Sequence, residues 1–279
     1  GKPIGAYNQT IKLIVTLVFI IILLTVITGK SPTFFLTSLG AMTAVLLLVF
    51  KDTILGFVGS IQITANDMLR IGDWVTMEKY GADGDVIEIN LTTVKVQNFD
   101  KTITTIPTYS FIADSFKNWR GMTDSDGRRI KRSLNIKVEK IKFAEKELIE
   151  RLSKVKLLSK FIEEQQQDIK DYNEKNGLNT PDQLNARRQT NIGLFRRYIE
   201  YYLQKNPLIN QDMTLMVRQL QTTTEGLPIE IYCFSATQVW AEYEVVMADI
   251  FDHLLSVVHA FDLDIHQSPT GSDFHKLVE

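Results

Sequence analysis

The chain has 279 residues, a formal net charge of -2 at pH 7 and one cysteine, Cys233. A net charge so close to zero supplies no bulk attraction for nucleic acid, and we expect no nucleic-acid partner. A single cysteine excludes an intrachain disulfide framework, and its position in an expected strand indicates a buried, inert thiol.

The first apolar segment covers residues 10–28. A helix of that length rises about 28 Å, which is enough to cross the hydrocarbon core of a bilayer. Its one charge, Lys12, lies at the end, where the side chain can reach the membrane surface. Residues 29–32 fit a tight turn better than the cleavage site of a signal peptide. Residues 10–28 and 33–50 therefore predict a transmembrane hairpin.

The second apolar segment, residues 33–65, is interrupted by Lys51 and Asp52. An isolated charge near a bilayer centre costs about 2.5–3.5 kcal/mol on insertion scales, so these residues indicate a membrane surface, a break or a water-filled path. The segment predicts one membrane-crossing helix, a break at Lys51-Asp52 and a second helix at the membrane interface. That second helix should bury its apolar side chains in lipid headgroups or against the next domain; these are Ile54, Leu55, Phe57, Val58 and Ile61.

Small residues recur at helical spacing through this segment. Such residues allow helix backbones to approach closely in lipid. We therefore expect close helix packing at Gly40, Gly56 and Gly59.

Residues 66–120 predict a small all-β domain. Trp74–Met77 has the composition of a strand, and apolar residues alternate from Ile87 onwards. Asp100-Lys101 is the expected hairpin tip between strands 91–99 and 102–107.

Residues 121–279 predict a cytoplasmic α+β domain. Its expected elements are a strand at 130–138, a helix at 141–155, strands at 213–220 and 228–234, a helix at 238–261 and a strand at 263–266. The order is βαββαβ, which is a ferredoxin-like arrangement, once the polar and largely helical segment 156–210 is treated as an insertion. The chain thus divides into membrane helices at 1–65, the β domain at 66–120 and the α+β domain at 121–279.

Few residues indicate chemistry. The histidines are not spaced to place two on one helix face, so we expect no metal site; they are His253, His259, His266 and His275. No nucleophile–base or paired-carboxylate arrangement stands out, so we expect no catalytic residue, no cofactor and no enzyme. The basic pairs Arg187-Arg188 and Arg196-Arg197 favour a solvated helix face, with an anionic partner as the alternative.

Three stretches carry a family resemblance: FKDTILGFVGSIQITANDMLRIGDWV, GDVIEINLTTVKVQNFDKTITTIPTYSF and FKNW. In this order they resemble the small-conductance mechanosensitive channel (MscS) family, and most closely its YbdG-like, or miniconductance, branch. The match is strong over about residues 33–120 and continues more loosely through RRQTNIGLFRRYI and residues 213–266.

The resemblance implies a homoheptamer whose kinked helix lines a central pore, with a β domain beneath the membrane and an α/β cage in the cytoplasm. It further implies a multi-pass protein of the bacterial inner membrane that opens under tension and releases ions and small osmolytes during hypo-osmotic shock. Its partners would be copies of itself, membrane lipids and the permeating ions.

The resemblance also indicates where the pore is narrowest. Leu48 aligns with a leucine ring of the family and is the first choice for the constriction; Leu47 and Ala44 are alternatives, and Phe50 would cap it from below. Ala44 stands at a position where the family has leucine, and the kink falls at Lys51-Asp52 where the family has Gln-Gly. These leucines could instead face lipid or neighbouring helices. A membrane-anchored scaffold or binding protein is the alternative function, and a membrane-bound enzyme is a third for which no site is found.

Overall fold

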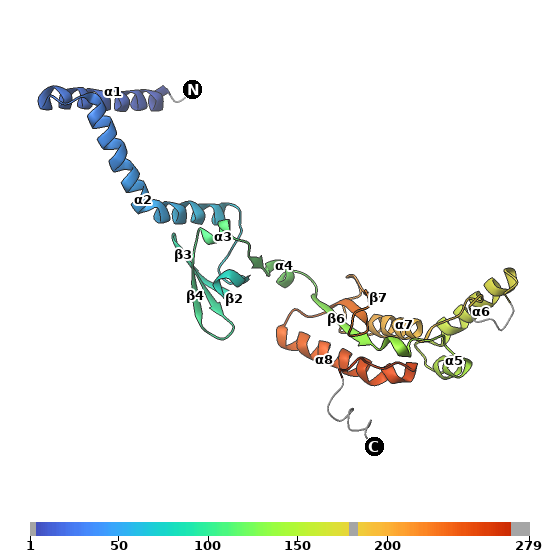
Figure 1. Cartoon of the computed structure of the whole chain (residues 1–279). Helices are drawn as coiled ribbons and strands as arrows, with labels where there is room; N and C mark the ends of the chain where they lie inside the picture. Colours follow the sequence, from blue (N-terminus) through green and yellow to red (C-terminus); the bar gives the residue numbers. More distant parts are fainter. Residues whose placement is uncertain (1–3, 179–183, 269–279) are drawn as a thin grey trace, which may run out of the picture. The chain divides into compact units, whose positions relative to one another are not determined.

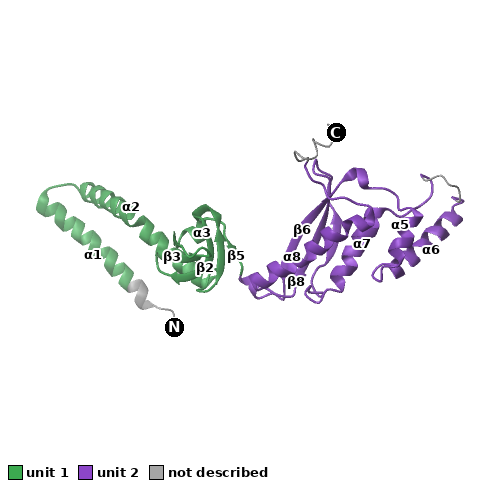
Figure 2. Cartoon of the chain, turned by 90° about the horizontal axis from the view of Figure 1, so that it is seen from below, with its two compact units in different colours: residues 1–119 green, residues 120–279 purple. Residues whose placement is uncertain are grey.

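The computed structural model describes residues 4–178 and 184–268, so His275 lies outside the described residues. The chain forms two compact units, residues 1–119 and residues 120–279 (Figure 2). This division lies one residue from the predicted start of the α+β domain.

Two long apolar helices begin unit 1, α1 (Ile4–Thr28) and α2 (Pro32–Ala65). Both are long and apolar enough to cross a membrane. Ser31 caps α2, since its side-chain oxygen accepts from the Phe34 amide, and Pro32 occupies the first turn, where its missing N–H costs nothing. The structure thus confirms the two apolar helices.

α2 is one uninterrupted helix of 34 residues. The α-helical backbone continues through Lys51 and Asp52, so the chain does not end one helix there and begin another. The ribbon instead bends as a continuous helix (Figure 1). A straight helix of this length would rise about 51 Å, well beyond the roughly 30 Å of a hydrocarbon core, so only part of α2 can lie in lipid.

A five-stranded antiparallel sheet follows, in the order β4-β3-β2-β1-β5. Its strands are β1 (Trp74–Met77), β2 (Ala82–Ile89), β3 (Thr93–Asn98), β4 (Ile103–Pro107) and β5 (Lys117–Asn118). Short helices lie between them, at η1 (Glu78–Tyr80) and α3 (Ser110–Ala113). The β domain is therefore confirmed, and Asp100-Lys101 joins β3 to β4 as expected. The Asp100 carboxylate accepts from the Thr102 amide and hydroxyl, and Lys101 has a left-handed backbone.

The core of unit 1 joins the sheet to α2. Ile63 of α2 is fully buried together with Val75, Val94 and Ile106 of the strands and Phe111 of α3. At Gly84 of β2 an added Cβ would lie 2.0 Å from the Gln97 carbonyl oxygen, so the strands approach there more closely than a side chain permits.

Unit 2 contains a three-stranded antiparallel sheet in the order β6-β8-β7. Its strands are β6 (Arg128–Ile136), β7 (Met216–Gln219) and β8 (Leu227–Ser235). Its helices are α4 (Arg120–Thr123), η2 (Val138–Lys140), α5 (Lys146–Ser153), α6 (Ser159–Lys175), α7 (Asn191–Gln204), α8 (Trp240–Val257) and η3 (Val258–Phe261). One hydrophobic core joins the sheet to α5, α6, α7 and α8.

Two features of unit 2 differ from the sequence expectations. The strand expected at 263–266 is a single bridge between Ile265 and Ile136, flanked by backbone hydrogen bonds from Lys137 and His266. The helix expected at 141–155 begins only at Lys146, because the backbone of residues 142–144 pairs with residues 189–191.

The segment 156–210 is also not wholly peripheral to the core. α7 contributes Leu194, Phe195, Ile199 and Leu203, each at most 1% exposed, whereas α6 buries only Ile162. α7 is therefore an integral part of unit 2, and its apolar stripe packs into the domain core.

Candidate pore helix and its attachment to the β domain

The apolar half of α2 carries every residue predicted to form the constriction. No described side chain in this half is buried within the chain. The buried residues of α2 are Gly56, Gly59 and Ile63, which all lie in its other half. Leu48 is 75% exposed, Leu47 57% and Phe50 52%, and Ala44 is exposed as well. An apolar surface of this extent needs lipid or another protein surface to cover it.

Lys51 and Asp52 follow directly and are both exposed. They lie in the continuous helix between the apolar half and the buried glycines. Gly40 has nothing within 4 Å of an added Cβ, so its expected role in helix packing would involve surfaces outside this chain.

The C-terminal half of α2 is fixed to the β domain along one face. Gly56, Gly59 and Ile63 are three and four residues apart, which places them on the same side of the helix. A Cβ on Gly56 would lie 3.1 Å from the Thr92 Cα, and a Cβ on Gly59 would lie 3.1 Å from the Tyr109 backbone nitrogen. The helix backbone therefore rests directly on two loops, one between β2 and β3 and the other after β4.

Thr108 holds these two loops together. Its amide donates to the Thr92 carbonyl at 2.9 Å, and its hydroxyl donates to the Asn90 carbonyl at 3.2 Å. The residue is fully buried, so water does not compete for these hydrogen bonds. The surface beneath Gly56 and Gly59 is thus a cross-linked pair of loops.

The opposite face of this half of α2 is apolar and exposed. Ile54, Phe57, Val58 and Ile61 are 41–51% exposed, and Leu55 is half-buried. These are the side chains predicted to bury in lipid headgroups or against the β domain. Within the chain the β domain takes the glycine face, which leaves the apolar face for another environment.

The connection from α2 to β1 is held by two carboxylates. Asp67, in a left-handed conformation, accepts two hydrogen bonds of 2.7 Å from the Arg70 guanidinium. Asp73 accepts from the Arg70 amide and from the Asn118 side-chain amide, each at 2.8 Å. Asn118 also donates to the Met68 carbonyl, so the end of the β domain is tied to the helix exit.

Two tryptophans pack together at β1 and β5 of the β domain. Trp74 and Trp119 stack with ring centroids 4.5 Å apart. The Trp119 indole donates to the Thr76 hydroxyl, and that hydroxyl and the Trp74 indole both donate to the Asp83 carboxylate, each at 2.8 Å. Sequence reasoning missed this network, although both tryptophans lie in the stretches that carry the family resemblance.

Burial and partners decide the reactivity of the lone cysteine and of an ion-paired carboxylate in the β domain. Burial raises the pKa of the Cys233 thiol to about 12, so the predicted inert thiol is confirmed. A hydrogen bond from Lys79 holds the pKa of the half-buried Asp114 carboxyl below its usual value. Residues 4–178 and 184–268 contain no group of three His, Cys, Asp or Glu side chains that could hold a metal ion.

Comparisons with known proteins agree with this geometry. The family described as "Mechanosensitive ion channel, beta-domain" matches residues 52–121. An uncharacterized MscS family protein of Helicobacter pylori is 22% identical over 262 residues, covering 92% of this chain and 38% of that protein. The small-conductance mechanosensitive channel MscMJ of Methanocaldococcus jannaschii is 32% identical over 155 residues, covering 54% of this chain and 41% of that protein.

The fold has a relative among solved structures. The crystal structure of Helicobacter pylori MscS in its closed state has a TM-score of 0.55 at 15% identity, covering 94% of this chain and 81% of that chain. The matched β-domain segment thus follows two helices that are long and apolar enough to cross a membrane. Together the findings support membership of the MscS family for this chain. The chain spans less than half the length of the curated relatives it matches.

Proposed function

We propose that this chain forms part of a mechanosensitive ion channel. Membrane tension would open it, and ions and small osmolytes would leave the cell through it during hypo-osmotic shock. The observation that carries the proposal is the attachment of α2, an apolar helix of membrane-spanning length whose glycine face rests on the matched β domain. A force on the membrane half would be carried by one continuous helix to a fixed base.

The channel would be a homo-oligomer, because one chain offers a single α2 and a pore needs several. Oligomeric channels in the family support this assembly, and we infer seven copies from the sequence resemblance. We also infer assignment to the YbdG-like branch and location in a bacterial inner membrane as a multi-pass protein with a cytoplasmic unit 2. Native mass spectrometry that gave a monomer or dimer would contradict the assembly.

The constriction would lie in the exposed apolar half of α2. A ring of leucines narrow enough to exclude water blocks ions without a charged plug. Leu48 is the first choice, since it aligns with a leucine ring of the resembled family and lies one turn before Lys51; it is also more exposed than Leu47 and Phe50. Leu47 and Ala44 are the neighbouring alternatives, and Phe50 would cap the constriction. We propose that α2 bends at Lys51 and Asp52, where the helix would leave the hydrocarbon core because these two residues are charged.

Unit 2 would be a ferredoxin-like domain in the cytoplasmic cage. Counted with the Ile265 bridge, its antiparallel pairings run in the order bridge, β6, β8, β7. A split βαβ arrangement gives this order when its last strand is reduced to one bridge. The domain would assemble copies beside the membrane and would carry no enzyme activity or cofactor.

Patch-clamp recording of the purified chain in liposomes under suction tests the function. The proposal expects unit currents that appear only as suction rises. Inserted, oligomeric protein that passes no current at any suction below membrane rupture would overturn it. A detergent-stable monomer without currents would favour the membrane-anchored scaffold.

A further inference from the structure

A basic cavity in unit 2 lies apart from the candidate pore helix. It has a volume of about 220 Å³ and is lined by α6, by the segment 187–190 and by the first two turns of α7. Four of its lining residues are arginines, Arg187, Arg188, Arg196 and Arg197. The sequence favoured a solvated helix face for these two basic pairs, whereas the fold directs both pairs to one cavity.

Two of the four arginines lack a carboxylate partner. Arg187 pairs with Asp168 at 3.1 Å and Arg197 pairs with Glu200 at 2.6 Å. Among the described residues no carboxylate lies within ion-pair distance of Arg188 or Arg196; the Arg188 guanidinium instead lies over the Phe143 ring, 5.0 Å from its centroid. The cavity therefore has two positive charges in excess, which matches one dianion.

Gln189 lines the same cavity and carries a buried donor. The side-chain amide nitrogen of Gln189 is the one buried side-chain polar atom of the described residues that has no hydrogen-bond partner, while its oxygen accepts from Gln166 at 3.0 Å. Leaving a buried donor without a partner costs free energy, and buried polar groups in folded proteins are almost always paired. An acceptor in the cavity would reach this nitrogen only if the Gln189 side chain turned, because solvent does not reach the atom in this structure.

The wall that carries these groups is preorganised. The Ala144 amide donates to the Gln189 carbonyl at 2.9 Å, and the side chain of Asn173 exchanges two hydrogen bonds with the Arg187 backbone. Thr190 caps α7 by accepting from the Gly193 amide, so the helix adds the positive end of its dipole to the cavity. Little ordering is left for a ligand to impose.

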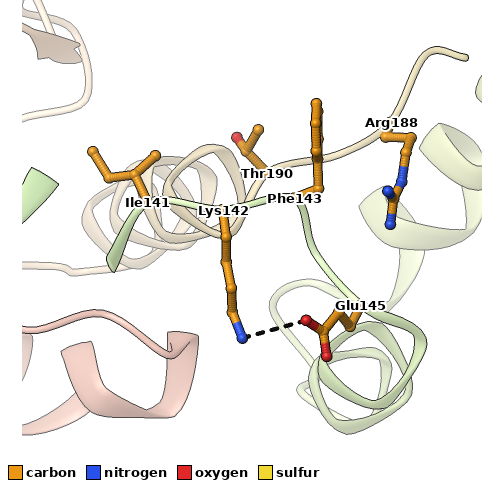
Figure 3. A pocket seen from close by; sticks show the side chains of 6 residues that line it. All are labelled: Ile141, Lys142, Phe143, Glu145, Arg188 and Thr190. Atoms are coloured by element: carbon orange, nitrogen blue, oxygen red, sulfur yellow. Dashed lines mark ion pairs between the residues drawn. The ribbon is translucent and has the colours of Figure 1, made fainter. Parts of the chain in front are cut away.

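A larger cavity of about 430 Å³ adjoins it and shares Arg188 and Thr190 (Figure 3). Ile141 and Phe143 supply apolar surface there, and Lys142 and Glu145 pair with each other at 3.6 Å. The second cavity offers room for an organic group attached to an anion held by the arginines.

We propose that the arginine-lined cavity binds the phosphate group of a small phosphorylated compound. A phosphate monoester carries about -1.5 to -2 charges at pH 7 and presents three acceptor oxygens, which suits two uncompensated guanidiniums. The planar fork of arginine pairs with two phosphate oxygens at once, so the recognition depends on geometry as well as charge.

Isothermal titration calorimetry of the full chain in detergent, with sodium phenyl phosphate at constant ionic strength, tests this, because this probe is a phosphate monoester with an organic group. We expect saturable binding that sodium acetate does not compete for. Arg188→Gln and Arg196→Gln should each weaken binding about tenfold, the size of a lost hydrogen bond to a charged group. The matched control is Arg151→Gln, which removes an arginine paired with Asp262 outside the cavity and should leave binding within about twofold.

Each variant is compared only after thermal unfolding shows a wild-type midpoint, and Arg196→Lys serves as the variant that keeps the charge. Weaker binding by Arg196→Lys supports the guanidinium geometry, and wild-type binding by it would overturn that geometry. Non-saturable heats, or equal weakening by Arg151→Gln, would overturn the site. The same titration is repeated in vesicles with and without phosphatidic acid. An affinity for phenyl phosphate that phosphatidic acid leaves unchanged supports a soluble compound, and an affinity that it lowers supports a lipid headgroup as the phosphate source.

Discussion

Replacing Gly59 by leucine tests the attachment of α2 to the β domain. An added Cβ would already lie 3.1 Å from the Tyr109 backbone, and the atoms beyond it would meet the loop held by Thr108. Over-packing of this kind costs about 1–3 kcal/mol. Replacing a helical glycine by leucine returns about 0.8–1 kcal/mol of helix propensity. The net expectation is a β domain destabilised by roughly 0–2 kcal/mol, together with an altered tension threshold.

The two effects are measured on the same preparation. Tryptophan fluorescence during urea unfolding follows Trp74 and Trp119 of the β domain, in a background where Trp240 is replaced by phenylalanine. Patch-clamp recording gives the opening pressure. Gln62→Leu is the control, because this residue lies on the exposed side of the same helix. If Gly59→Leu has the urea midpoint and opening pressure of Gln62→Leu, the glycine face does not hold the helix and the reasoning fails.

Three further outcomes are expected. Leu48→Ser should keep the constriction hydrated, so the channel should open at a lower pressure or conduct ions at rest. If only Leu47→Ser conducts at rest, the constriction lies at Leu47 instead. Normal gating in both variants would refute the proposed constriction. Gly84→Ala should abolish the cooperative unfolding transition of the β domain, since its Cβ would lie 2.0 Å from a backbone oxygen, whereas Gly121→Ala, with nothing within 4 Å, should not. Cys233, with a pKa of about 12, should resist maleimide at pH 8 until urea unfolds the domain, and rapid labelling of folded protein would refute its burial.

The features that the sequence predicted well are local ones. Residues 10–28 and 33–50 were predictable as helices because an unbroken apolar segment of that length is typical of a membrane-spanning helix. The turn at Asp100-Lys101 was predictable because a short acidic side chain bonds to the backbone two residues later, as Asp100 does with Thr102. In each case the deciding interaction lies within a few residues.

The features that escaped prediction depend on distant parts of the chain. The spacing of small residues predicted close packing at Gly59. Its observed contact is the backbone of Tyr109, fifty positions further along the chain. The pattern of residues within one helix cannot identify a partner so distant in sequence. Residues 142–144 leave the expected helix because residues 189–191 supply their hydrogen bonds. The constriction remains a proposal for a related reason, since the surfaces that would face Leu48 belong to other molecules.

The continuity of α2 has a mechanical consequence. From Ala41 to Leu55 the helix contains neither glycine nor proline, so no residue there bends at negligible cost. Because Gly56, Gly59 and Ile63 hold the C-terminal turns against the β domain, a change of tilt in the apolar half must stretch backbone hydrogen bonds on the convex side. Those stretched bonds would store elastic energy and return it when the load is removed. α2 would then act as a bending spring clamped at one end, with a stiffness set by its own backbone.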